Sequence, residues 1–290
     1  MNELKVLIPV DPTDGRTAPL RMAAQLAHRL PLHAELLHVF QPPSFPNTPM
    51  GGVGYYAEFY TEQRKAFEGQ LANLAQSEHL KGCTSVTCQL VESVAATGVA
   101  IGQYAADQGC GLILTSAKYR TQFDSFVEGS ELTRLVRNAR VPVLCLSEEQ
   151  PLPPCRLVLY ATDLSDRSAK ALLALAPLLR QLGARTRAIH VSTPTHFMTT
   201  RTLTELSGQF LDRIAAADGP LFEELGGLTS YNEADLVAGL LHAATDVGAD
   251  VVALGTHGRT GLQLFLEGSI TQQVLAASHL PVLTYRMPEA

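Results

Sequence analysis

Short apolar runs alternate with longer segments of helical periodicity along the whole chain. In the first half, this pattern predicts strands over 4–10, 34–40, 84–91, 111–115 and 142–146, and helices over 16–30, 56–79, 94–108 and 129–138. In the second half, it predicts strands over 156–161, 185–191, 227–231, 250–254 and 281–285, and helices over 166–182, 200–217, 233–247 and 268–277. The run 251–254 is apolar without alternation, which is typical of strands covered on both faces. Each half is therefore predicted to be an α/β, doubly wound domain with a five-stranded parallel sheet.

The two halves are related by an internal repeat. Residues 6–11 recur as 158–163, and Leu37-His38-Val39 recurs as Ile189-His190-Val191, both at an offset of 152 residues. Later segments match at an offset of 139, as Glu128-Gly129-Ser130 does with Glu267-Gly268-Ser269. The second copy is therefore 13 residues shorter, and the extra residues fall in the Pro- and Gly-rich loop 41–54 of the first copy.

The repeat also predicts the domain limits. Residues 148–154 are first charged and then rich in proline, a composition that suits a short stiff linker. We expect domains over 1–147 and 155–290, consistent with a 290-residue chain at roughly 150 residues per domain.

Composition and charge argue against some classes of partner and indicate the cellular compartment. A net charge of −6, a pI near 5.8 and no cluster of basic residues argue against nucleic acid or an anionic membrane as partner. The longest apolar run, 171–179, contains Pro177 and is too short to span a bilayer, and the N-terminus lacks the pattern of a signal peptide. Five cysteines without metal-ligand spacing are expected to be buried thiols, so we expect a cytoplasmic protein without a metal site.

The loop after the fourth strand of the second half carries the clearest chemical signal. It contains Gly255, Gly258, Gly268 and Ser269 in the spacing G-x2-G-x9-G-S. Glycines allow the backbone to approach a bulky anion and to present successive N–H groups to it. Gly268 and Ser269 open the last helix, whose first turn carries unpaired N–H groups and a partial positive charge. This loop is therefore predicted to bind phosphate.

The spacing, together with the segment Tyr160-Ala161-Thr162-Asp163-Leu164-Ser165, resembles the ATP-binding universal stress proteins. The resemblance covers nearly the whole chain, twice, and implies an adenine-nucleotide α-hydrolase-like fold with ATP as ligand, with or without Mg²⁺. It implies that Asp163 and the backbone near Val191 hold the adenosine part and that Thr162 lines the same pocket. It also implies that Gly255, Gly258, Gly268 and Ser269 surround the ribose and phosphates.

Other readings of these residues stay open. Asp163 also suits a helix entry, where its carboxylate would satisfy free N–H groups. Thr256, His257 and Arg259 lie inside the loop, and we include them among the nucleotide-binding residues. Arg259 could place a positive charge near the phosphates or be a solvated surface residue, and His257 could pack the loop or contact the nucleotide.

The first copy departs from the pattern at the same loop. Ser116 stands where the second copy has Gly255, and Tyr119 stands where it has Gly258. Asp11, Arg120, Gly129 and Ser130 persist, so this half could keep an anion site or an altered ligand pocket, without full affinity for ATP. The loop 41–54, with Phe45, could cover that pocket, form an interface or be a solvated insertion.

These observations predict a nucleotide-binding regulatory protein of the stress response with at most slow ATP hydrolysis. The chain has no G-x4-G-K-[ST] loop, and Asp163-Leu164-Ser165 stands where an oxidoreductase would have G-x-G-x-x-G. The alternatives are a slow ATP-hydrolysing or adenylyl- or phosphoryl-transferring enzyme and a nucleotide-free scaffold. The resemblance further implies that the two domains pair with each other through the strands around 143–145 and 282–284, which leaves a homodimer of the whole chain open.

Overall fold

A computed structural model describes residues 2–41, 53–117, 130–194, 198–256 and 268–286. The N-terminal half contains β1 (Leu4–Pro9), α1 (Ala18–Ala27), β2 (Leu32–Phe40), α2 (Val53–Ala75), the 3₁₀ helix η2 (Glu78–Leu80), β3 (Ser85–Glu92), α3 (Thr97–Asp107), β4 (Leu112–Ala117), α4 (Glu131–Asn138) and β5 (Val143–Ser147). The C-terminal half contains β6 (Leu157–Ala161), α5 (Asp166–Leu182), β7 (Arg185–Ser192), α6 (Thr200–Ala217), α7 (Gly219–Leu225), β8 (Leu228–Asn232), α8 (Leu236–Asp246), β9 (Val251–Thr256), α9 (Gly268–Ala277) and β10 (Val282–Arg286).

Within the described residues, ten strands form one sheet in the order β3-β2-β1-β4-β5-β10-β9-β6-β7-β8. All neighbours within each half are parallel, which confirms the predicted five-stranded parallel sheets. The β5–β10 pair is antiparallel and joins the halves, with Cys145 opposite Val282, Leu144 opposite Leu283 and Val143 opposite Thr284. The structure therefore has the predicted pairing of the two final strands.

The contact between the halves is symmetric. Leu144 and Leu283 are counterparts at the offset of 139 residues, and they lie opposite each other in the sheet. Thr133 and Gln272 are counterparts at the same offset, and the side chain of Gln272 donates a hydrogen bond to Thr133 Oγ1 at 3.1 Å. A residue meets its own counterpart only near a twofold axis, so these contacts place the pseudo-twofold axis between α4 and α9 and between β5 and β10.

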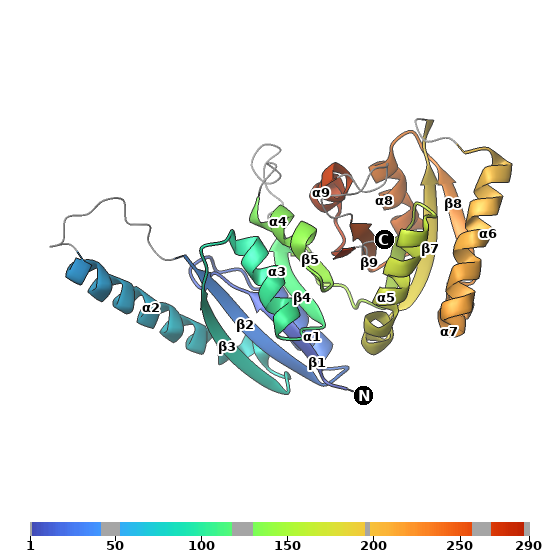
Figure 1. Ribbon diagram of the computed structural model, residues 1–290. Coiled ribbons are helices and arrows are strands. Elements are labelled where there is room, and N and C mark those ends of the chain that lie inside the picture. The colour runs from blue at the N-terminus through green and yellow to red at the C-terminus, as the bar shows by residue number, and fades with distance from the viewer. Residues whose placement is uncertain (1, 42–52, 118–129, 195–197, 257–267, 287–290) are drawn as a thin grey trace.

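Helices cover both faces of the sheet, as Figure 1 shows. One apolar core packs against α1, α5, α6 and α7, and its residues run from Leu4 in β1 to Leu283 in β10. The core on the other face includes residues of α3, α4, α8 and α9. Each core contains residues of both halves, so the domain pair buries apolar surface across the junction as well as pairing strands.

Two features of the secondary structure were not predicted. Helix α7 follows α6 directly, because the side chain of Asp218 accepts a hydrogen bond from Leu221 N (3.0 Å) and starts a new helix with Leu221 and Leu225 buried. Helix α1 begins at Ala18, two residues later than expected, because a distant carboxylate binds its first amides. The expected strand over 227–231 is confirmed as β8.

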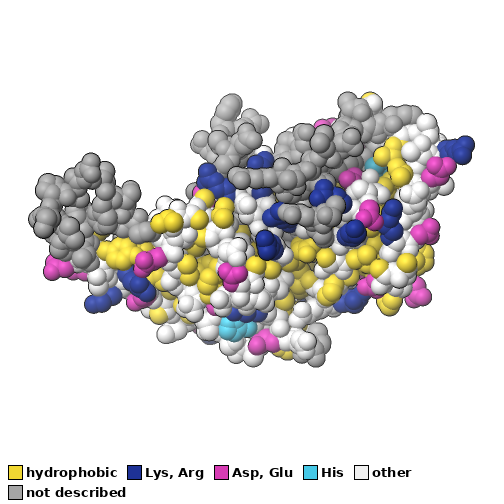
Figure 2. Space-filling view, viewed as in Figure 1, with side chains coloured by type: hydrophobic (Ala, Val, Ile, Leu, Met, Phe, Trp, Pro, Cys, Tyr) yellow, Lys and Arg dark blue, Asp and Glu magenta, His cyan; other side chains and the backbone are white. Residues whose placement is uncertain are grey.

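The surface carries mixed charge. Acidic and basic side chains are interspersed over the face shown in Figure 2. Of the helices in the described ranges, none combines the length and the apolar character needed to cross a bilayer. Most of the loop 41–54, including Phe45, lies outside the described residues, so its expected roles stay predictions.

Candidate functional site

The carboxyl ends of β6, β7 and β9 meet where the strand order of the C-terminal half reverses. Ala161 pairs with Ile189 on one side and with Leu254 on the other. Continuing this register past the end of β6 would bring Thr162 level with Gly255 and Asp163 level with Val191. Residues far apart in the sequence therefore converge at the edge where doubly wound folds bind their ligands.

Thr162 is buried and fixed by hydrogen bonds. Its amide donates to Ile189 O at 2.9 Å, and its Oγ1 lies 2.8 Å from Ser168 Oγ in α5. Asp163 follows it, and its Oδ1 accepts a hydrogen bond from Ser165 N at 3.0 Å. This bond confirms the helix-entry role for Asp163. Its second carboxylate oxygen makes no hydrogen bond to the part of the chain that the structure describes, so both roles weighed for this residue fit the geometry.

The turn that places Asp163 is strained. Leu164 has a φ of +66°, a left-handed conformation that is unfavourable for a residue with a branched side chain. Its amide is held by Thr162 Oγ1 at 2.9 Å, and its side chain is buried. Such strain occurs most often at ligand sites, where the surrounding structure holds it in place.

His190 is a site residue that the sequence interpretation did not include. Its Nδ1 lies 3.0 Å from the carbonyl oxygen of Thr162, so it links β7 to the end of β6 beside Asp163. Burial lowers the pKa of His190, although the hydrogen bond to Thr162 and the charge of Asp163 act in the opposite direction. A neutral imidazole that donates from Nδ1 is the state that suits this contact. The repeated pair His38-Val39 and His190-Val191 was the signal that could have identified it.

Val191 presents its backbone to the same space. Thr162 N binds Ile189 O, and Glu233 N binds Ser192 O. Because alternate residues of a strand direct their backbone groups to opposite sides, the amide and carbonyl of Val191 face the space beyond the end of β6. Helix α8 lies against this strand at Gly239, where an added Cβ would be 2.8 Å from Val191 Cγ1. This close packing fixes the position of Val191.

The segment predicted to bind phosphate is described only at its two ends. Gly255 and Thr256 are the last residues of β9, and Gly268 and Ser269 are the first residues of α9. Thr256 is buried, and its Oγ1 lies 3.5 Å from Val136 O in α4 of the other half. His257, Gly258 and Arg259 lie outside the described residues, so their expected contacts stay predictions.

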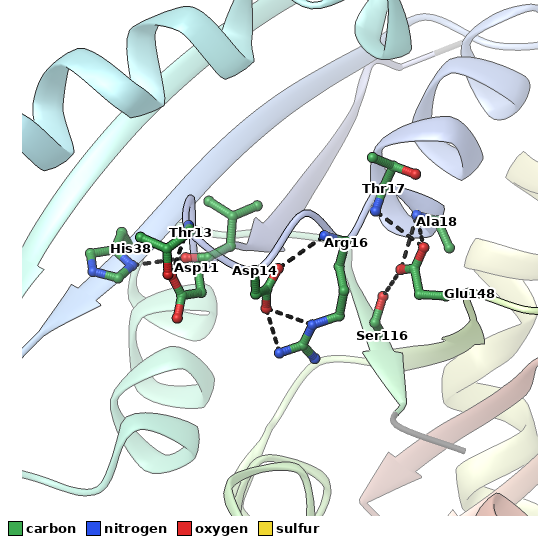
Figure 3. A network of polar contacts seen from close by, with 10 residues as sticks. Asp11, Thr13, Asp14, Arg16, Thr17, Ala18, His38, Ser116 and Glu148 are labelled. Atoms are coloured by element: carbon green, nitrogen blue, oxygen red, sulfur yellow. Dashed lines mark hydrogen bonds and ion pairs between the residues drawn. The ribbon is translucent and has the colours of Figure 1, made fainter. Parts of the chain in front are cut away.

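The N-terminal half has a related constellation, shown in Figure 3. Asp11 Oδ1 accepts from Thr13 N at 3.0 Å, and His38 Nδ1 lies 2.9 Å from Val10 O. Burial alone would raise the pKa of Asp11, but hydrogen bonds from Thr13 and the charges of His38 and Arg16 hold that pKa below its usual value. A cavity of about 350 Å³ lies at this edge of the sheet. The two halves therefore share the turn and the histidine contact.

The C-terminal arrangement is suited to binding a nucleotide. Asp163 offers a carboxylate oxygen, Val191 offers backbone groups, and the start of α9 offers amides with a partial positive charge. Together these residues could hold a polar ring system at one end and phosphates at the other. They fit the adenine nucleotide that the sequence predicts.

Comparisons with known proteins agree with this fold. The model of the Universal stress protein family matches residues 4–147 and again residues 155–286. A universal stress protein structure from Archaeoglobus fulgidus is similar with a TM-score of 0.64 and 17% identity, over 97% of this chain and 98% of that one. The functionally unknown protein PA1789 from Pseudomonas aeruginosa gives a TM-score of 0.60 and 17% identity, over 98% of this chain and 92% of that one.

A curated relative matches a shorter stretch. Universal stress protein MJ0577 from Methanocaldococcus jannaschii is 38% identical over 56 residues, which is 18% of this chain and 35% of that protein. The chain thus spans about a third of the length of this relative.

Proposed function

Because the chain belongs to the universal stress protein family, whose model matches both halves, we propose that it is a regulatory protein of the stress response that binds one ATP per chain. The nucleotide site lies in the C-terminal half. ATP acts through conformation or assembly, with no fast catalysis. The domain limits that we propose with it are 1–147 and 155–290, with 148–154 as the linker.

The strand register carries this proposal, because Ala161 pairs with both Ile189 and Leu254, and the candidate residues Thr162, Asp163, Val191 and Gly255 follow these positions in the sequence. The available oxygen of Asp163 and the backbone of Val191 supply contacts for the adenosine part. The glycine-spaced segment and the first turn of α9 supply amides for the phosphates. ATP would be bound with its base near β7 and its phosphates toward α9.

Asymmetry between the halves supports a single site. In the N-terminal half, Ser116 replaces the glycine that corresponds to Gly255, and its hydroxyl is hydrogen-bonded to the carboxylate of Glu148. A polyphosphate placed there would meet a negative charge and a side chain, whereas the corresponding residues of the C-terminal sequence are Met287 and Gly255. We therefore expect ATP to bind to the C-terminal half with higher affinity than to the N-terminal half.

Two matched variants test this function. Asp163→Ala should weaken ATP binding about tenfold to a hundredfold, the effect of losing a hydrogen bond to a charged group. Asp11→Ala is the control, because it removes the same kind of turn bond, at 3.0 Å in both halves, from the half without the proposed site. Titration calorimetry of each full-length variant gives the affinities. Equal losses in both variants, or no loss in Asp163→Ala, would count against the proposal.

A further inference from the structure

The cavity in the N-terminal half is large enough for a small molecule. Its volume of about 350 Å³ lies at the lower end of the range for ligand sites, roughly 300–1,000 Å³. The ends of β1, β2 and β4 and the starts of α1, α3 and α4 contribute to its walls. Apolar side chains such as Leu37, Ile101 and Leu135 line it. Its charged lining residues are Asp11, Glu131 and the ion pair of Asp14 with Arg16.

A carboxylate of the chain itself occupies the start of α1 beside this cavity. Glu148 accepts hydrogen bonds from Thr17 N at 3.1 Å and from Ala18 N at 3.0 Å, as Figure 3 shows. Ser116, which lines the cavity at the end of β4, donates its hydroxyl to the same carboxylate. The start of a helix is where an external anion would otherwise bind. Glu148 therefore takes that position and adds a negative charge to it.

A second carboxylate has the same role at α3. Ala96 precedes this helix and has no side-chain acceptor, and Glu131 from α4 reaches across to accept a hydrogen bond from Gly98 N at 2.6 Å. Glu131 also lines the cavity. The N-termini of α1 and α3, which face the cavity, are thus capped by acidic side chains from other parts of the chain.

The C-terminal half does not repeat these two carboxylates. At the offset of 139 residues, Ile270 corresponds to Glu131 and Met287 corresponds to Glu148. Helix α5 is capped by its own Ser165, which accepts from Ser168 N at 3.1 Å, and α8 by its own Asp235, which accepts from Ala238 N at 2.8 Å. The contrast in charge therefore lies at the first helix of each half, where the uncharged Ser165 caps α5 and Glu148 caps α1, whereas α8 keeps an acidic cap from its own Asp235.

The other end of the cavity keeps the features that both halves share. The turn bond of Asp11 matches that of Asp163, and the contact of His38 with Val10 matches that of His190 with Thr162, at 2.9 and 3.0 Å. The end corresponding to the adenosine part is thus preserved, whereas the end corresponding to the phosphates is acidic.

We propose that the N-terminal cavity is a second ligand site that binds an uncharged nucleoside and excludes its phosphorylated forms, with Glu148 as the residue that sets this specificity. The inference rests on the proposed function, because the likeness to the C-terminal site is what points to a nucleoside. A phosphate entering the cavity would meet the carboxylate of Glu131, which lines it, and would approach that of Glu148, which is hydrogen-bonded to the lining residues Thr17 and Ser116. Like charges in a partly desolvated site repel strongly. A nucleoside lacks that charge.

The test uses hydrogen exchange of the full chain with adenosine or ATP as probe. Adenosine should slow exchange in residues 11–18 and 97–101, which border the cavity. ATP at the same concentration should slow exchange at the C-terminal site, including residues 162–168, and leave 11–18 and 97–101 unchanged. Glu148→Gln keeps an acceptor oxygen for Thr17 and Ala18 but removes the charge. In this variant ATP should also protect residues 11–18, with an apparent affinity at least tenfold higher than in the wild type. The exposed Glu3 precedes β1 at the end of the strand away from the cavity and gives the control Glu3→Gln, which should behave as the wild type does.

Two results would overturn the inference. The first is that adenosine leaves amide exchange in residues 11–18 and 97–101 unchanged, while ATP slows exchange in residues 162–168. The second is that ATP slows amide exchange in residues 11–18 of a folded Glu148→Gln variant no more than it does in the wild type. Failure of ATP to protect 162–168 would instead refute the proposed function, and the response of residues 11–18 to adenosine would still decide this inference.

Discussion

Gly258→Tyr should abolish ATP binding while leaving the chain folded. This change copies into the C-terminal loop the residue that the N-terminal half has at the corresponding position, Tyr119. A tyrosine ring would occupy space that the glycine spacing leaves for phosphates, and a residue with a Cβ resists the backbone conformations that glycine permits. We expect the affinity to fall by two orders of magnitude or more, which corresponds to about 2.7 kcal/mol.

A matched control separates this effect from a general change of the loop. Gly261→Gln copies another N-terminal residue, Gln122, at a glycine outside the G-x2-G-x9-G-S spacing. It should retain ATP binding close to that of the wild type. Calorimetry with circular dichroism as the check on folding decides the comparison. A folded Gly258→Tyr protein with wild-type affinity would show that this loop is not the site.

Val282→Pro should loosen the pair of domains. Val252 N binds Pro281 O at 3.0 Å, so the backbone groups of Pro281 face β9, and alternation directs the amide of Val282 toward Cys145 in β5. Proline removes that amide and places a ring in the middle of the sheet. We expect amide exchange in residues 142–146 of the other half to accelerate about tenfold or more, equivalent to ~1.4 kcal/mol of opening free energy.

Less disruptive substitutions test the same strand pairing if the Val282→Pro variant does not fold. Leu144 and Leu283 are buried and lie directly opposite each other across the junction. Truncating each to alanine, singly and together, should give a coupling energy of about 0.5 kcal/mol or more in unfolding experiments. Additive losses, or unchanged exchange at 142–146 in a folded Val282→Pro chain, would mean that the domains meet through another surface.

The repeat made most of the fold predictable. Apolar runs, their spacing and the agreement between two copies predicted the strands of both halves, and the family resemblance predicted that β5 pairs with β10. Helix α7 was missed because it has only 7 residues and depends on the cap from Asp218. Pro19 in the first turn of α1 was a local signal for its start that the sequence interpretation did not use. The contact of Glu148 with Thr17, 131 residues away in the sequence, could not be predicted.

The candidate site was predictable only in part. Asp163 and Val191 were placed together only through the resemblance to the ATP-binding universal stress proteins, and the pairing of Ala161 with Ile189 is consistent with that placement. His190 was overlooked although its counterpart His38 precedes Val39 in the same way, because a buried histidine between apolar residues gives no sign of which backbone oxygen it contacts. The acidic side chains that cap α1 and α3 beside the N-terminal cavity come from residues distant in the sequence, as in the contact of Glu131 with Gly98.

The intact chain is the appropriate material for the decisive experiment, because separated halves would expose β5 and β10 as unpaired edges. Nucleotide carried through purification should first be identified by mass spectrometry and removed. Titration calorimetry of the stripped chain with ATP then measures stoichiometry directly. We expect one ATP to bind per chain, and we expect this binding to be lost in Gly258→Tyr and retained in Asp11→Ala. Two equivalent ATP sites per chain, or no binding at millimolar ATP, would contradict it.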